Sequence, residues 1–120
     1  MHEYCQRCVM SDRMFNAAVK ARKLRKQCLL HIKKHNISFN ELEILFLIMR
    51  KEDITPAKIS RDLYIEPAIV SRKLKILSDK RMVQYKQNKK DRRVVNLSIS
   101  EKGKRLVNSI LTSINDKSDS

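Results

Sequence analysis

Glycine is almost absent from this chain, with 1 residue in 120. Loops that cradle phosphate groups in nucleotide-binding enzymes need several glycines, because only glycine lets the backbone approach a phosphate closely. The sequence also lacks a nucleophile elbow and a pair of carboxylates spaced for acid and base catalysis. We therefore expect a protein that is not an enzyme and that carries no cofactor.

Cysteine, tryptophan and long apolar segments are scarce as well. The 3 cysteines, Cys5, Cys8 and Cys28, are an odd number, and no secretory leader is visible, so reduced thiols are expected rather than a disulfide framework. The longest uninterrupted apolar stretch covers residues 44–49, which is far too short to cross a membrane. We expect a cytoplasmic protein without a membrane partner.

Acidic residues are few beside basic ones. The chain has 13 Asp and Glu against 27 Lys and Arg, a net charge of +14, which is typical of proteins whose partner is a polyanion. Residues 55–105 hold 15 of the basic residues and 5 of the acidic ones, a net charge of +10. A nucleic-acid surface is therefore expected in the second half of the chain, whereas the basic run in residues 20–26 is equally well explained as a solvated helix face.

A chain of 120 residues is long enough for one domain with a modest core. We expect residues 1–10 to form an N-terminal segment, residues 11–115 to form the single domain, and residues 116–120 to be a disordered tail. Residues 11–34 show a helical spacing of apolar residues around a strongly basic middle. They predict one long helix whose apolar anchors are Phe15, Val19, Leu29 and Ile32.

Capping signals mark the starts of the next two helices. Ser38 followed by Glu41 is a capping box, and it opens a helix that continues through the apolar residues 42–49. Thr55 followed by Pro56 opens a short helix, because the threonine can cap and the proline fits the first turn.

A second short helix begins at Pro67 after a tight turn at residues 64–66. Two short helices separated by three residues make a helix-turn-helix. Along the second helix, Val70, Leu74 and Leu77 form a stripe for the core. The opposite face carries small, hydroxyl and cationic side chains, which suit close approach and hydrogen bonding to base edges in a major groove. These residues are Ala68, Ser71, Arg72 and Lys75.

Beyond residue 80 the apolar period changes to two, so residues 82–87 and 94–99 are predicted strands. The side chains expected to be buried are Val83, Tyr85, Val95, Leu97 and Ile99. Between the strands lies a polar hairpin tip with four cations, which are Lys89, Lys90, Arg92 and Arg93. A positively charged ribbon after a helix-turn-helix is a wing, so the expected fold class is mainly α with a small β-hairpin, a winged helix-turn-helix.

Ser100 is the expected N-cap of a last helix. Its apolar residues form a stripe too broad for a solvated tail, so this helix needs a partner surface. These residues are Leu106, Val107, Ile110, Leu111 and Ile114.

The order of these elements, and the residues inside them, resemble the MarR family of winged-helix regulators, with a length similar to its short Sar-like members. The resemblance covers about residues 38–111. Its less specific part joins residues 59–63 with Val70, Ser71, Arg72 and Leu77. Its most specific part looks like the wing of the family and the start of its closing helix: Lys90, Asp91, Arg92 and Arg93, then residues 94–99, then Ser100, Glu101, Lys102 and Gly103.

The resemblance implies a transcriptional regulator that binds double-stranded DNA at a pseudo-palindromic operator as a homodimer, with the reading helix in the major groove and the wing in the minor groove. Carried over, Arg93 enters the minor groove and Asp91 orients it, since a narrow minor groove concentrates negative potential. The same two residues could instead form a simple surface turn pair. The other DNA contacts expected outside the reading helix come from Lys58, Lys86, Lys89, Lys90 and Arg92.

Two departures from the family pattern matter. Arg81 stands just before the ribbon, where many members have glycine, so the preceding helix needs a different cap or a strained residue. The closing helix is also short compared with full-length members, which have further helical mass for dimerisation. The first and last helices are therefore expected to share the dimer interface.

Three alternatives remain open. The net charge would serve a non-sequence-specific architectural or RNA-binding protein equally well, and the fold could be reused for protein contacts. The regulator could also respond to metal or redox state through Cys5, Cys8 and Cys28. A zinc site could use His2, Cys5 and Cys8, completed by Cys28, His31 or His35. For redox sensing, cations near Cys28 could lower its thiol pKa. Against both, Cys28 could simply be a small packing residue on the first helix.

Overall fold

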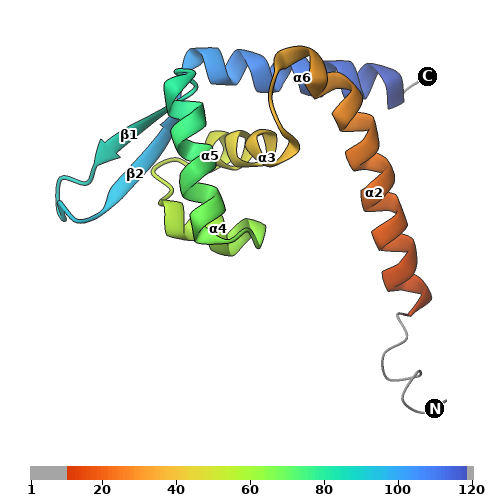
Figure 1. The fold of residues 1–120 in the computed structure, drawn as a ribbon, viewed down its shortest axis with the longest axis horizontal. Helices are drawn as coiled ribbons and strands as arrows, with labels where there is room; N and C mark the ends of the chain where they lie inside the picture. The colour runs from red at the N-terminus through yellow and green to blue at the C-terminus, as the bar shows by residue number, and fades with distance from the viewer. Residues whose placement is uncertain (1–10, 119–120) are drawn as a thin grey trace, which may run out of the picture.

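The computed structural model describes residues 11–118 of the chain. A long helix, α2 (Asp12–Ile32), continues into a 3₁₀ turn, η1 (Lys33–His35), and is followed by α3 (Phe39–Arg50), α4 (Pro56–Leu63) and α5 (Pro67–Asp79). An antiparallel hairpin of β1 (Val83–Gln87) and β2 (Val95–Ile99) precedes α6 (Glu101–Ser118). The hairpin and the pair α4 and α5 lie on the same side of α6 (Figure 1). This order confirms the expected class, a mainly helical winged helix-turn-helix.

The predicted capping signals are confirmed at the starts of α3 and α4. Ser38 Oγ accepts a hydrogen bond from the Glu41 N–H at 3.2 Å, and the Glu41 carboxylate accepts one from the Ser38 N–H at 3.2 Å. Thr55 Oγ1 accepts a hydrogen bond from the Lys58 N–H at 3.2 Å. These bonds pair N–H groups that the first turn of a helix leaves without a partner, so both helices begin where the sequence indicates.

The core forms where α3 meets α5, α6 and the hairpin. The Leu97 N–H donates to the Ile54 carbonyl oxygen at 2.8 Å, which joins the segment before α4 to the edge of the hairpin. Burying one aliphatic side chain stabilises the fold by about 1.5–3 kcal/mol relative to leaving it exposed. Because Val70, Leu74 and Leu77 are all buried, α5 is held firmly along its inner side. The fully buried side chains are Ile32, Ile44, Leu45, Ile48, Ile59, Val70, Leu74, Leu77, Leu97, Val107 and Ile110.

The hairpin is less buried than its alternating pattern predicts. Its register pairs Tyr85 with Leu97, and Leu97 and Val83 are buried as expected, while Ile99 is half-buried. Tyr85 and Val95, however, are 47% and 36% exposed, so the prediction that they are buried was wrong. The reason is that the outer half of the hairpin projects past the helices (Figure 1) and has no core to pack against.

Most apolar anchors predicted for α2 are also exposed. Ile32 is buried, but Phe15, Val19 and Leu29 are 59%, 44% and 44% exposed, because α2 projects away from the helices that carry the core (Figure 1). The radius of gyration is 17.5 Å, whereas a compact chain of this length has about 14 Å. A single copy of the chain therefore leaves the apolar side chains of α2 uncovered.

The last helix is longer than predicted. We expected the domain to end at residue 115, and α6 continues to Ser118. Residues 119–120 and the expected N-terminal segment lie outside the described residues. Within residues 11–118, no helix combines the length and the apolar character that a membrane span requires.

Arg81 is the strained residue that its position before the ribbon predicts. Its φ of 62° lies in the left-handed region, where glycine is the usual residue at the end of a helix. The Met82 N–H donates to the Leu77 carbonyl oxygen and the Arg81 N–H donates to that of Ser78, both at 2.9 Å. These two bonds are the ones that form when a glycine ends a helix in the left-handed conformation. The helix α5 therefore ends with Arg81 in a strained backbone conformation, and not with a different cap.

The single glycine, Gly103, lies buried in the first turn of α6, where the hairpin meets the helix. A Cβ at this position would lie 2.6 Å from the Met82 carbonyl oxygen and 2.7 Å from Ile99 Cγ1. We expect Gly103→Ala to lower the free energy of unfolding by about 1–3 kcal/mol, although alanine favours a helix over glycine by about 1 kcal/mol. Urea denaturation measures the change, and Asn108→Ala at an exposed position of α6 is the control, expected to be neutral or slightly stabilising. A Gly103→Ala protein as stable as the unaltered one would contradict the close approach.

Candidate nucleic-acid interface

The outer face of α5 presents the side chains expected of a reading helix. Ala68, Ser71, Arg72 and Lys75 are all exposed, while the apolar stripe on the other side of the same helix is buried. The small side chain of Ala68 lies in the first turn, where it leaves room for close approach. The sequence-predicted set on α5 is therefore brought together on one accessible surface.

One carboxylate and two cations lie on α4, directly before the turn that leads to α5. Lys58 and Arg61 are exposed and lie three residues apart, so they project from one side of the helix. Asp62 accepts a hydrogen bond from Lys51 Nζ at 2.9 Å. This bond, with the positive charges of Lys51, Lys58 and Arg61, holds the pKa of Asp62 below its ordinary value. Arg61 thus joins Lys58 as a cation of the surface, although the sequence analysis did not select it.

The tip of the wing is built by two side chains that bond to its backbone. Asn88 Oδ1 accepts hydrogen bonds from the Lys90 N–H at 2.8 Å and the Asp91 N–H at 3.1 Å. Asp91 Oδ1 accepts from the Arg93 N–H at 3.0 Å and from Arg93 Nε at 3.3 Å. The Arg93 side chain is nevertheless 91% exposed. Asp91 therefore holds the backbone N–H and one guanidinium nitrogen of Arg93, while most of the Arg93 side chain remains exposed to solvent. Arg92 beside it is exposed as well.

The lysines of the wing do not share one environment. Lys86, Lys89 and Lys90 line a hollow beside the wing together with Asp53. Lys86 also lines a second hollow, and the carboxylates of Glu52 and Asp53 line this hollow as well. Because these carboxylates offset part of its charge, we expect Lys86 to be the weakest phosphate contact of the three.

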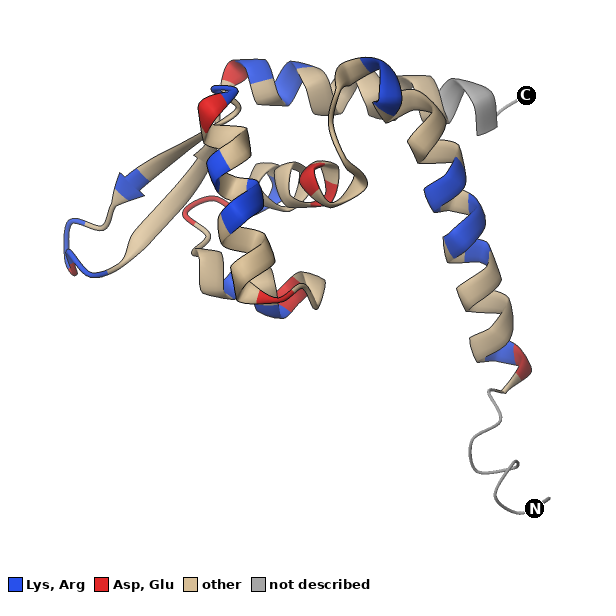
Figure 2. Cartoon of the chain, viewed as in Figure 1, with Lys and Arg blue, Asp and Glu red and all other residues tan. Residues whose placement is uncertain are grey.

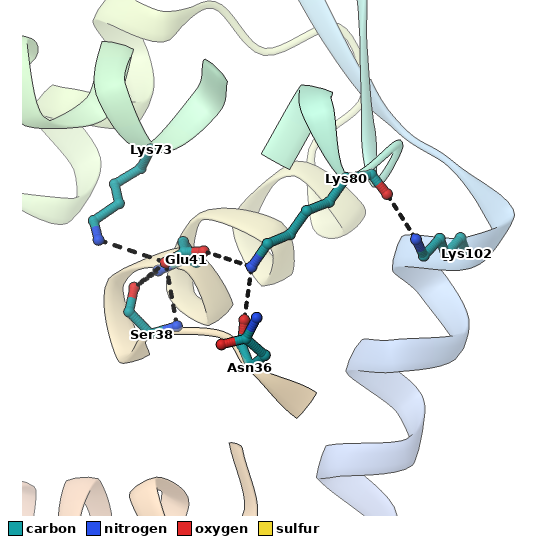
Figure 3. Close-up of polar contacts among 6 residues, drawn as sticks. All are labelled: Asn36, Ser38, Glu41, Lys73, Lys80 and Lys102. Atoms are coloured by element: carbon teal, nitrogen blue, oxygen red, sulfur yellow. Dashed lines mark hydrogen bonds and ion pairs between the residues drawn. The ribbon is translucent and has the colours of Figure 1, made fainter. Parts of the chain in front are cut away.

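A buried carboxylate anchors α5 from its inner side. Glu41 of α3 is 5% exposed and lies between Lys73 of α5 and Lys80, the C-cap of α5. Lys73 Nζ is 3.5 Å from Oε2 and Lys80 Nζ is 3.6 Å from Oε1 (Figure 3). Lys80 Nζ also donates to the Asn36 carbonyl oxygen at 2.6 Å, and Lys102 Nζ donates to the Lys80 carbonyl oxygen at 2.8 Å. These contacts tie the reading helix to α3, to the turn after η1 and to the start of α6.

The charge state of Glu41 follows from competing effects. Burial alone would raise the pKa of Glu41, but the hydrogen bonds from the Ser38 hydroxyl and N–H and the charges of Lys73 and Lys80 outweigh it, so the pKa lies below its ordinary value. The carboxylate is therefore ionised at neutral pH. Two lysines of α5 are committed to this inner contact, which leaves Arg72 and Lys75 as the outward cations of the helix.

Burial, rather than neighbouring cations, sets the direction of the pKa shift of Cys28, the cysteine that the structure describes. Burial raises the pKa of Cys28, so the prediction that neighbouring cations would lower it was wrong. Cys5 and Cys8 lie outside the described residues, and within residues 11–118 no group of three or more His, Cys, Asp or Glu is placed to hold a metal ion. Cys28 is half-buried and is best described as a packing residue of α2.

Two structural roles were not predicted from the sequence. Asn88 bonds to the backbone of the wing tip, and Glu41 contacts Lys73 and Lys80 in addition to capping α3. An asparagine whose side chain bonds to backbone N–H groups two and three residues later is a known turn signal, so Asn88 could have been found. Glu41 was recognised as a helix cap, but its lysines lie more than 30 residues further along the chain. No local pattern would have indicated that contact.

Basic residues lie on most elements of the molecule, including the start of α6 (Figure 2). Lys and Arg occupy the wing tip, α4 and α5, and a separate group lies in the middle of α2 (Figure 2). A cationic reading helix beside a cationic two-stranded wing defines a winged helix-turn-helix protein of the nucleic-acid-binding class.

Comparison with known protein families gives one match to this sequence. The sequence model of the MarR family matches residues 37–95, a segment that begins just before α3 and includes the helix-turn-helix and the wing tip. This match covers just under half of the chain, and over that segment the chain is similar to the MarR family. No curated protein sequence matches the chain significantly.

Several solved structures have the same fold as this chain. The YusO protein from Bacillus subtilis is 21% identical, with 92% of this chain and 78% of that chain covered and a TM-score of 0.73. A mutant of MepR from S. aureus, bound to an oligodeoxyribonucleotide, is 18% identical, with 92% and 80% covered and a TM-score of 0.75. Wild-type MarR from E. coli in its apo form is 17% identical, with 91% and 82% covered and a TM-score of 0.78. At these identities the likeness establishes the fold.

Proposed function

We propose that this protein is a DNA-binding transcriptional regulator of the MarR family that acts as a homodimer and recognises a specific duplex sequence. The reading helix α5 enters the major groove and places Ser71, Arg72 and Lys75 at base edges. The wing follows the adjacent minor groove, where Asp91 orients Arg93. Phosphate contacts come from Lys58, Lys86, Lys89, Lys90 and Arg92.

The observation that carries this proposal is the two-sided character of α5. Its inner side is fixed by the buried stripe and by the contacts of Lys73 and Lys80 with Glu41. Its outer side exposes Ala68, Ser71, Arg72 and Lys75. A helix held in this way can dock into a groove without rearrangement, and it offers small, hydroxyl and cationic groups in the order that base recognition needs.

A second copy of the chain is the partner that the apolar residues of α2 require. Soluble monomers seldom expose a large contiguous apolar patch, and α2 packs against α6, so both helices can contribute to one interface. The exposed apolar residues are Met14, Phe15, Val19, Leu24, Leu29 and Leu30. In the dimer, we expect the two reading helices to lie about 34–36 Å apart and to address half-sites one helical turn apart.

Selection of bound duplexes from a random pool at physiological salt tests this proposal. We expect a pseudo-palindrome whose half-sites are separated by about 10 base pairs, and sedimentation should give the mass of a dimer. Equal recovery of all sequences would reject sequence-specific reading in favour of an architectural nucleic-acid-binding protein. A dimer that binds no duplex would favour a protein-contact module.

The division of labour between α5 and the wing gives a sharper test. Arg72→Ala is expected to reduce discrimination at one base pair of each half-site by about 1–3 kcal/mol, because a guanidinium that pairs with a base edge carries sequence information. Lys89→Ala is expected to weaken the preferred and random duplexes alike, because a phosphate contact carries none. Binding titrations of both variants on both duplexes measure the difference. Equal losses on the two duplexes for both variants would refute the division.

A further inference from the structure

Tyr64 is the C-cap of α4 and, like Arg81 at the end of α5, it closes its helix in a backbone conformation that its side chain disfavours. Its φ of 55° and ψ of 42° place it in the left-handed region, which glycine and asparagine tolerate and a bulky aromatic residue seldom occupies. Its side chain is also 95% exposed. Strain of this kind persists where the surrounding structure fixes it, and it concentrates at functional sites.

The turn around Tyr64 is ordered. The Tyr64 N–H donates to the Ser60 carbonyl oxygen, the Ile65 N–H donates to the same oxygen at 3.2 Å, and the Ser60 hydroxyl donates to the Ile65 carbonyl oxygen. Leu63 and Ile65, on either side of the tyrosine, pack against the core. The phenol ring therefore projects from a fixed point into solvent.

The position of Tyr64 in the reading head indicates what the ring meets. It follows the exposed cations Lys58 and Arg61 at the same spacing of three residues and precedes the N-terminal end of α5 by three residues. In a docked helix-turn-helix the start of the reading helix approaches the bases while the helix before it crosses the sugar-phosphate backbone. The turn that joins them consequently runs beside the backbone.

We propose that the hydroxyl of Tyr64 donates a hydrogen bond to a phosphate oxygen of the duplex, next to the phosphates contacted by Lys58 and Arg61. Tyrosine is among the side chains that bond to phosphate oxygens at protein–DNA interfaces. This inference rests on the proposed function. It assigns a DNA contact to a residue that the charge pattern of the sequence does not single out.

The other left-handed residues support this choice. Four non-glycine residues within residues 11–118 have positive φ, and two of them, Asn36 and Asp53, have short polar side chains that tolerate this region. Arg81 closes the C-terminal end of α5, away from the end that approaches the bases. Tyr64 alone among the four combines a bulky aromatic side chain with a place at the start of the reading helix.

The test compares Tyr64→Phe and Tyr64→Gly with Tyr85→Phe as a matched control. The hydroxyl of Tyr85 lies near Asp79 at the C-terminal end of α5, where burial and that carboxylate raise the pKa of Tyr85. We expect Tyr64→Phe to weaken duplex affinity by about two- to tenfold, the value of one hydrogen bond, and equally on preferred and random duplexes. Tyr64→Gly should lose at least as much duplex affinity as Tyr64→Phe. Its Tm should stay unchanged or rise, because glycine relieves the backbone strain. Tyr85→Phe should bind as the unaltered protein does.

Each other outcome overturns the assignment. Unchanged affinity of both Tyr64 variants would make the residue strained without a role in binding, and loss in Tyr64→Gly alone would assign the effect to the ring rather than the hydroxyl. Loss confined to the preferred duplex would indicate a base contact instead of a phosphate contact. If the unaltered protein binds no duplex, the proposed function fails with it. If Arg72→Ala still relaxes base preference while Tyr64→Phe has no effect, this inference alone fails.

Discussion

Raising the salt concentration from about 50 to 200 mM is expected to weaken the binding of this protein to duplex DNA on the order of 10³–10⁵-fold. Each lysine or arginine that neutralises a phosphate releases a condensed counterion, and salt opposes that release. A dimer that makes about 6–10 such contacts should give a slope of log affinity against log salt of about −5 to −9. Titrations of a labelled duplex across a salt series measure the slope.

Variants that remove one charge locate the contacts. Lys89→Gln and Lys90→Gln should each make the slope shallower by about 1 for every protomer that makes the contact. Lys23→Gln is the control, because Lys23 is equally exposed but lies on α2, outside the candidate interface. An equal change for Lys23→Gln would place α2 on the DNA, and a slope near zero would remove phosphate contact as the basis of affinity.

The starts of the helices could be predicted because their causes are local. The capping box of Ser38 and Glu41 and the cap at Thr55 join residues three apart, so the sequence contains every atom that the inference needs. The exposure of Ser71, Arg72 and Lys75 follows for the same reason, since a helical period that buries Val70 turns these residues outward. Much of the candidate interface is thus readable from short-range spacing.

The extent of burial could not be predicted, because a period indicates which side of an element faces the core but not how far the core reaches. Tyr85 shares the inner face of the hairpin with Val83 and yet is exposed. Phe15 shows the same effect on α2, where a partner is needed to complete the core. The contact of Lys73 and Lys80 with an inner carboxylate likewise depends on the tertiary structure. The sequence alone therefore does not distinguish these lysines from the exposed Lys75.

That inner contact leads to the largest stability effect that we expect. Glu41→Ala should lower the free energy of unfolding at neutral pH by about 2–4 kcal/mol, of which about 1 kcal/mol is the lost helix cap. The rest comes from Lys73 and Lys80, whose side chains are 23% and 30% exposed and would lose their counter-charge. Urea denaturation measures the change.

The control is Asp62→Ala, which breaks a pair with a shorter distance. Lys51 Nζ lies 2.9 Å from Asp62, against 3.5 and 3.6 Å for the pairs of Glu41, but the side chains of Lys51 and Asp62 are 49% and 27% exposed. If burial rather than distance sets the cost, Asp62→Ala should have much the smaller effect, because water solvates the lysine that remains. A larger loss for Asp62→Ala would reverse that ranking.

Acid titration separates the charge of Glu41 from its role as a cap. Because the folded-state pKa is lowered from an ordinary value of about 4.5, the stability that the carboxylate contributes is complete above that pH and is lost as the pH falls through the folded pKa. Glu41→Gln keeps the side-chain shape without the charge, so the unaltered protein should be the more stable of the two at neutral pH, and the gap should shrink on acidification below about 4.5. A gap that stays constant or widens in acid would show that the lysines do not hold an ionised carboxylate. Since the same lysines belong to α5, a gap that closes would also show that the reading helix is anchored through this charge.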